Sequence, residues 1–221
     1  MGEEVLAIGG ICARTWDVRE PGRRNILSCI DVCDLTDGSW QPRNSLDCRR
    51  HDFALATVAS RTYVLGGVTR PEGASATDDG TLSPCDAVEV ISEAGKKIRT
   101  CPTMPVGVWG SHAIVVGRRI LIFGGSSCAA SPEPVQEYET VTENWTILRP
   151  ALRLSPLAEP FCLVSGICVH TGACVRVFGG STEAGKFLGE AIFDDSLEMC
   201  DVRGFSRWGF AFGVAVPLCS C

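Results

Sequence analysis

The sequence lacks the long apolar run that a membrane-spanning helix needs. None of its 221 residues fall in a stretch that approaches about 20 consecutive apolar positions. The N-terminus, Met1–Glu4, is acidic where a secretory signal would be basic, and Leu6 stands where a myristoylation pattern needs Ser or Thr. We therefore expect a protein of the cytoplasm or nucleus that has no membrane partner.

Positive charge is also scarce. Lys and Arg number 20 against 26 Asp and Glu, which gives a net charge of −6. Proteins that bind nucleic acid normally carry a basic face, so this balance argues against a nucleic-acid partner. Hydrophobic residues make up 45% and charged residues 21%, as in an ordinary globular chain.

Residues that commonly carry metal or catalytic chemistry are few or badly spaced. Only three histidines are present (His51, His112 and His170), and the 13 cysteines include no Cys-x-x-Cys pair. A zinc site usually needs two close pairs of Cys or His, and a disulfide framework usually needs a secreted protein. We therefore expect no cofactor and no metal, and we interpret the cysteines as reduced. Several lie in apolar runs, where a thiol acts as a small buried hydrophobe: Cys29, Cys33, Cys162, Cys168 and Cys174.

What the sequence does contain is an apolar run that ends in two glycines, four times. The runs are Val5–Gly10, Tyr63–Gly67, Ile120–Gly125 and Val175–Gly180. Their first glycines, Gly9, Gly66, Gly124 and Gly179, are 57, 58 and 55 positions apart. A nearly constant period of this length indicates a repeat architecture.

Each repeat also has the pattern of a small antiparallel sheet. Before the last three glycine pairs, a second apolar run and a turn predict a hairpin, with first strands at Phe53–Val58, Ala113–Val116 and Leu163–Val169. The third strands are predicted at Cys29–Leu35, Ala87–Ile91, Val135–Tyr138 and Leu197–Val202. A tryptophan follows in three copies, at Trp40, Trp145 and Trp208. Seven residues before it stand Cys33 and Tyr138, and in the second copy Ile91 and Ile98 have this spacing.

This combination of features resembles the kelch repeat over essentially the whole chain. The residues that carry the resemblance are Gly9, Gly10, Gly66, Gly67, Gly124, Gly125, Gly179, Gly180, Trp40, Tyr138, Trp145 and Trp208. The resemblance implies an all-β kelch-type β-propeller in which each repeat is a four-stranded blade. It implies a single domain, 1–221, with blades at roughly 1–45, 46–101, 102–150 and 151–221. Glycine would permit close approach, and the large Trp would fill the space between blades.

The number of strands leaves two alternatives for the ring. No apolar run precedes Val5, so the first blade lacks its first strand, and the tail Gly209–Val216 reads as one more strand. Either this tail pairs with the first blade and closes a four-bladed ring, or the ring is partial. A partial ring would expose unpaired edges and favour oligomers.

One glycine pair also mimics a phosphate loop. Gly180–Lys186 fits the spacing Gly-x4-Gly-Lys, but Phe187 stands where Ser or Thr would bind magnesium. The repeat already accounts for these glycines, so we interpret them as structural. The carboxylate pairs Asp78–Asp79 and Asp194–Asp195 are interpreted as solvated loop charges rather than a cation site.

A partner is expected to bind the loops, because loops on a rigid scaffold commonly carry function. The residues expected to contact it are Arg14, Trp16, Arg23, Arg24, Arg49, Arg50, His51, Trp109, Ser111, His112, Ser126 and Ser127. Arginine pairs well with carboxylate and phosphate groups, so the five arginines are proposed as a patch for an acidic or phosphorylated peptide. The alternative is that each is a solvated charge paired with a neighbour: Asp17, Glu20, Asp47 or Asp52.

The resemblance implies a protein-interaction scaffold, used in that family as a substrate-recognition or cytoskeletal adaptor. It also leaves an enzymatic alternative, a sugar isomerase or oxidase acting on a small molecule at the central channel. The sequence contains no Gly-x-Ser-x-Gly elbow and no His-Glu-x-x-His motif. We therefore expect a binding protein with no catalytic residue.

Overall fold

The computed structural model describes residues 4–12, 25–70, 82–92, 95–127, 134–149, 167–172, 174–178, 181–182, 185–186, 189–194 and 199–204. Throughout these residues the regular elements are β-strands, so the all-β prediction is confirmed. No helix that could span a bilayer is found among them. The chain divides into two compact units, Met1–Trp109 and Gly110–Cys221, which are described separately.

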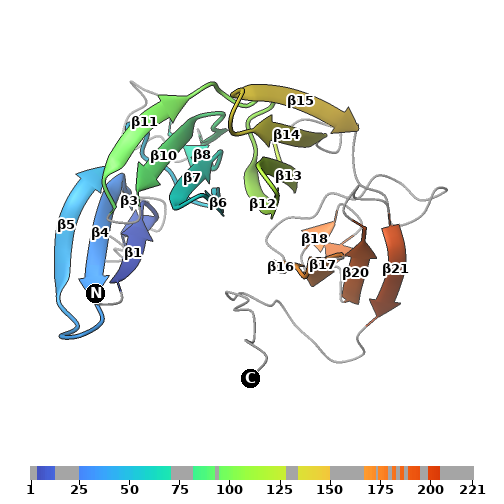
Figure 1. Ribbon diagram of the computed structural model, residues 1–221, viewed down its shortest axis with the longest axis horizontal. Coiled ribbons are helices and arrows are strands. Elements are labelled where there is room, and N and C mark those ends of the chain that lie inside the picture. The colour runs from blue at the N-terminus through green and yellow to red at the C-terminus, as the bar shows by residue number, and fades with distance from the viewer. Residues whose placement is uncertain are drawn as a thin grey trace, which may run out of the picture. The chain divides into compact units, whose positions relative to one another are not determined.

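The first unit contains two of the larger antiparallel sheets (Figure 1). A three-stranded sheet has the order β1-β4-β5, and a four-stranded sheet has the order β11-β10-β7-β6. Their strands are β1 (Glu4–Ile8), β4 (Cys29–Asp34), β5 (Trp40–Ser45), β6 (Ala54–Val58), β7 (Arg61–Leu65), β10 (Val88–Ser92) and β11 (Lys97–Cys101). Within the described residues β1 is an edge strand, and the tail 209–216, which would pair with it in one of the two alternatives, lies outside them.

The second unit contains two four-stranded sheets, of order β12-β13-β14-β15 and β16-β17-β20-β21. Strand β12 begins at the boundary between the units. The strands are β12 (Trp109–Val116), β13 (Arg119–Ser126), β14 (Val135–Glu139), β15 (Asn144–Arg149), β16 (Ile167–His170), β17 (Val175–Phe178), β20 (Gly189–Phe193) and β21 (Met199–Gly204). Each of the four predicted repeat ranges therefore contains one of the larger sheets.

Three short two-stranded ribbons lie between the second and third strands of their repeats. They pair β2 (Ile11–Cys12) with β3 (Asn25–Ile26), β8 (Val68–Thr69) with β9 (Ser83–Pro84), and β18 (Ser181–Thr182) with β19 (Gly185–Lys186). The first two ribbons begin directly after Gly9–Gly10 and Gly66–Gly67. Gly179 and Gly180, like the predicted repeat residue Trp208, lie outside the described residues.

The predicted third strand of the fourth repeat is wrong. Residues 197–202 were expected to pair with the glycine-terminated strand, but β20 occupies that place and β21 is the outer strand. The connection from β17 to β20 is shorter than its counterparts in the first two repeats, so aligning on Trp208 moved the prediction too far along the chain. Glu190 also interrupts the apolar pattern of β20. Its carboxylate pairs with Arg176 at 2.6 Å across the sheet.

The seven-residue spacing before the tryptophans corresponds to a cross-strand pair in two repeats. Tyr138 lies directly opposite Trp145, with ring centroids 4.9 Å apart, and Cys33 lies opposite Trp40. In the second repeat a register shift places Lys97, and not Ile98, opposite Ile91. Trp40 is 54% exposed, so the expectation that it fills buried space between sheets is wrong.

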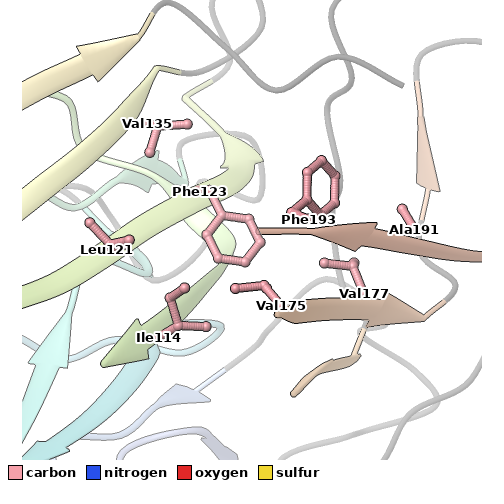
Figure 2. Packing of buried hydrophobic residues seen from close by; sticks show 8 residues of the cluster. All are labelled: Ile114, Leu121, Phe123, Val135, Val175, Val177, Ala191 and Phe193. Carbon is pink, nitrogen blue, oxygen red and sulfur yellow. The ribbon is translucent and has the colours of Figure 1, made fainter. Parts of the chain in front are cut away.

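Apolar side chains from two sheets form a core within each unit. In the first unit Ile30 and Leu46 pack with Val64 and Ile91. In the second unit, residues of β12, β13 and β14 pack against residues of β17 and β20, with Phe123 and Phe193 among them (Figure 2). In β13 the four residues Ile120–Phe123 are all buried, so both faces of the strand are covered and its sequence is continuously apolar there.

The glycine pairs bind the segment that leaves their own sheet. Gly10 N–H donates to Arg50 O at 3.1 Å, and Gly67 N–H donates to Val108 O at 2.7 Å. A Cβ on Gly9 would stand 2.7 Å from Arg50 O, and one on Gly66 would stand 2.5 Å from Val108 O. Both glycines also have left-handed backbone angles, φ +54° and +67°. A side chain is therefore excluded by both space and conformation.

Substituting Gly66 tests this close approach. Gly38 is a matched control, because its φ is +72° but nothing lies within 4 Å of its Cβ position. Gly38→Ala should lower the free energy of unfolding by about 1 kcal/mol through backbone strain alone. Gly66→Ala should cost at least about 2 kcal/mol more, because the Val108 carbonyl must move. Urea denaturation of both variants measures the difference, and equal costs would contradict the close approach.

Candidate functional site

The segment between the first two sheets, residues 46–53, holds three of the predicted partner-binding residues. Arg49 is exposed, whereas Arg50 is 0% and His51 is 5% exposed. The main chain here lies between two ribbons. Arg50 N–H donates to Leu27 O at 3.2 Å on the side of the β2–β3 ribbon, and His51 and Val68 exchange backbone hydrogen bonds on the side of the β8–β9 ribbon.

The Arg50 side chain enters the second sheet, where its guanidinium is enclosed. Nη1 donates to Ala87 O at 2.6 Å, and Nη2 donates to Val64 O at 3.3 Å and to Glu89 Oε2 at 2.7 Å. Glu89 is itself only 1% exposed. Nη1 and Nη2 are thus bound by one buried carboxylate and two backbone carbonyls, whereas the buried Nε has no hydrogen-bond partner among the described residues.

The other Glu89 oxygen connects this pair to the surface. Oε1 accepts the Asp47 N–H at 2.8 Å and lies 3.5 Å from Lys97 Nζ. Lys97 also pairs with the Asp47 carboxylate, which accepts Thr100 Oγ1 at 3.0 Å. The hydrogen bonds from Lys97 and Thr100 lower the pKa of Asp47 below its ordinary value. The charges of this network therefore run from the buried Arg50 outward to the exposed Asp47.

Arg50 and His51 must be removed from the predicted binding patch. The arginine is neither a partner contact nor a solvated charge, because its hydrogen bonds are made inside the protein. His51 is held by its backbone bridge to Val68, with its ring buried. The charged residues of the network that the sequence interpretation missed are Glu89 and Lys97. A signal existed, since Glu89 interrupts the apolar run Val88–Ile91, and a charge in such a strand needs a buried partner.

The three predicted residues on β12 also differ from exposed loop contacts. Ser111 is buried, whereas Trp109 and His112 are partly buried. The His112 ring centroid lies 5.8 Å from that of Phe123. Burial lowers the pKa of His112 to about 4, so its ring is neutral at pH 7 and supplies no positive charge to an acidic partner.

The remaining predicted contacts divide between the surface and the undescribed part of the chain. Ser126 and Ser127 are partly exposed at the end of β13, after Gly124–Gly125. Arg14, Trp16, Arg23 and Arg24 lie outside the described residues, between β2 and β3 in the sequence. Arg49 is therefore the exposed arginine of the predicted patch within the described ranges. Its carbonyl accepts Thr69 Oγ1 at 2.7 Å, which fixes it beside the β8–β9 ribbon.

The structure offers no support for phosphate-loop or metal chemistry where it can be described. Ser181–Thr182 pairs with Gly185–Lys186, and the next element is strand β20, where a phosphate loop would need a helix. Among the described side chains, no group of three or more His, Cys, Asp and Glu residues is placed to hold a metal ion.

Arg50→Ala should destabilise the protein by about 3–5 kcal/mol, because it leaves the buried Glu89 carboxylate without its cation. Arg49→Ala is the matched control at the adjacent position. It should change the free energy of unfolding by less than about 0.5 kcal/mol, since its side chain is exposed. Urea denaturation at pH 7 measures both. Similar small effects for the two arginines would mean that Arg50 is solvated after all.

Stability should fall as the pH drops from 7 to 5, with a contribution from His112. The unfolded chain takes up a proton near the ordinary value of 6.5, but the folded protein does so only near 4. Between these values the unfolded state binds more protons, so acid favours unfolding. His112→Gln should flatten the dependence of the urea midpoint on pH, whereas His170→Gln should leave it steep. An unchanged slope in His112→Gln would show that this ring is not neutral and buried.

Comparison with known proteins shows a similar fold but does not show a family for this chain. No family model matches the chain, and no curated protein matches its sequence. Among solved structures, it is similar to one titled "Structure of YjhT", with a TM-score of 0.64 at 13% identity over 81% of this chain and 60% of that one. The chain thus spans about 60% of that protein's length, and at this identity the likeness concerns the fold alone. The chain is an all-β protein of small antiparallel sheets that resembles a β-propeller-like fold.

Proposed function

We propose that this chain is a kelch-type β-propeller scaffold that binds an acidic segment of a protein partner beside its glycine-linked ribbons. The observation that carries the proposal is the position of Arg49. It is exposed on a segment whose backbone is hydrogen-bonded to Gly10 and Leu27 on one side and to Val68 on the other. A single arginine is thereby presented on a rigid backbone between two ribbons.

The repeat supports the propeller part of the proposal. Three four-stranded antiparallel sheets and one three-stranded sheet follow each other along the chain. The first two repeats share the same glycine hydrogen bond: Gly9 N–H to Cys29 O corresponds to Gly66 N–H to Ala87 O, with the donors 57 and the acceptors 58 residues apart. Regular units of this kind need neighbours to cover their faces, which is the principle of repeat architectures.

The sequence between the two strands of the first ribbon supports the choice of partner. Residues 13–24 contain Arg14, Arg19, Arg23 and Arg24 together with Trp16. Arginine and tryptophan are enriched among the residues that dominate binding energy at protein interfaces. Arginine also pairs with carboxylate or phosphate through two parallel hydrogen bonds. An acidic or phosphorylated peptide fits this composition and the outward Arg49.

A peptide array tests the proposal. The purified chain is incubated with acidic, phosphorylated and sequence-matched neutral peptides, and the best ligands are titrated by fluorescence polarisation. Arg49→Glu should weaken binding by about tenfold or more, as expected for loss of one charge-assisted contact worth about 1.4 kcal/mol. Arg61→Glu is the control, since Arg61 is exposed at the opposite end of β7 from Gly66.

Two results would contradict the proposal. One is an array on which acidic peptides bind no better than their neutral counterparts. The other is an acidic ligand whose affinity is unchanged by Arg49→Glu, or is lowered as much by Arg61→Glu. The affinity of a specific acidic ligand should also fall as salt is raised, because exposed charges are screened.

A further inference from the structure

Two cysteines that are far apart in the sequence meet beside the buried Arg50. Cys48 belongs to the 46–53 segment, and Cys85 directly follows β9 (Ser83–Pro84). Their sulfurs are 3.8 Å apart, within hydrogen-bonding distance. Both cysteines are free, and both lie in the first unit. Thirty-seven positions separate them in the chain, so the fold and not the sequence creates this contact.

The surroundings of the two thiols are different. Cys85 is buried, and Arg50 Nη1 lies 3.7 Å from its sulfur. Cys48 is more open, and its sulfur lies 3.3 Å from Thr69 Oγ1. The hydrogen bond with Cys48, the Ala87 backbone and the Arg50 charge lower the pKa of Cys85, and the hydrogen bond with Cys85 raises the pKa of Cys48.

This division matches what disulfide formation requires. The thiolate, and not the thiol, is the nucleophile, and positive charge nearby favours the thiolate. The Cys85 sulfur is thus the one that reacts first, as a thiolate. Cys48 remains a thiol within contact distance of it. Low-pKa cysteines beside a resolving cysteine are the usual arrangement of thiols that respond to oxidants.

We propose that Cys48 and Cys85 form a reversible disulfide when the protein meets a hydroperoxide. Formation requires the two sulfurs to move from 3.8 Å apart to a bond of about 2 Å. The bond would join the segment that carries Arg49 to the end of the β8–β9 ribbon. It would also close a loop that contains this whole ribbon.

The chemistry balances with hydrogen peroxide as the oxidant. The Cys85 thiolate attacks one peroxide oxygen, the O–O bond breaks, and the products are a Cys85 sulfenic acid and hydroxide, which takes up a proton to become water. The Cys48 sulfur then attacks the Cys85 sulfur, the S–O bond breaks, and the hydroxyl leaves as water with the Cys48 proton. Two thiols and one peroxide give one disulfide and two waters. A dithiol reduces the disulfide back to two thiols by thiol–disulfide exchange and is itself oxidised to a disulfide.

The test is a peptide map of the full chain after mild peroxide treatment, alkylation and trypsin digestion. Cys48 lies in the expected peptide 44–49 and Cys85 in 62–96, because the Arg70–Pro71 bond resists trypsin, and each peptide has no other cysteine. The result expected is a linked pair of these two peptides that forms in the folded protein and disappears after dithiothreitol. Oxidation in urea should instead give a mixture of pairs, since 13 cysteines are then free to meet.

Two single variants test the order of the steps. With Cys48→Ser, peroxide should leave a sulfenic acid on Cys85 that dimedone labels, because the resolving thiol is gone. With Cys85→Ser, dimedone should not label Cys48. Cys33→Ser is the control, since it removes another buried thiol of the same unit and should leave the linked pair intact.

The proposal is overturned if the folded wild-type chain yields no 44–49 to 62–96 pair while its other thiols oxidise. It is equally overturned if the linked pair is no more abundant in the folded protein than in urea. Both results are read on the unmutated protein, so neither depends on whether a variant folds.

Discussion

The structure of the first unit depends on one backbone contact made twice. A glycine pair with left-handed backbone angles follows the second strand of a repeat. The N–H of the second glycine donates a hydrogen bond to a carbonyl oxygen of the segment that leaves that sheet. The carbonyl belongs to Arg50 in the first repeat and to Val108 in the second. Because a Cβ at Gly9 or Gly66 would collide with this oxygen, glycine is required there for space as well as for its angles. The contact fixes where each connecting segment runs.

Fixing the backbone also determines whether the side chain at that position is buried. Arg50 and Val108 occupy equivalent places, and both are fully buried. A valine there needs nothing further, but an arginine brings a charge into the core. Removing such a charge from water costs free energy. A partner of opposite charge offsets this cost only when the geometry of the ion pair is good. Glu89 and the carbonyls of Val64 and Ala87 supply those partners, so this contact holds the segment that precedes the second sheet against it.

Sequence patterns predicted the strands where local chemistry and tertiary position agree. Apolar runs that end in Gly-Gly located strands β1, β7, β13 and β17, and the seven-residue spacing of Tyr138 and Trp145 corresponds to a cross-strand pair. The third strand of the fourth repeat was misplaced, and Glu190 on β20 contributed because it is polar for a tertiary reason, its pairing with Arg176. At the site, composition could not separate Arg49 from Arg50. Only alignment with Val108, 58 residues later, marks one of the two positions as buried.

The exposure of Arg49 and the burial of Arg50 have one cause. Backbone hydrogen bonds on both sides fix this segment, which directs Arg50 into the second sheet and leaves Arg49 exposed. Arg50 also lies against Cys85, whose thiol contacts Cys48 on the same segment. The exposed charge, the buried ion pair and the thiol pair are therefore three consequences of one backbone position. Under the two proposals above, partner recognition and the redox state of the thiol pair would both act through the 46–53 segment, which also holds the arginine of the buried ion pair.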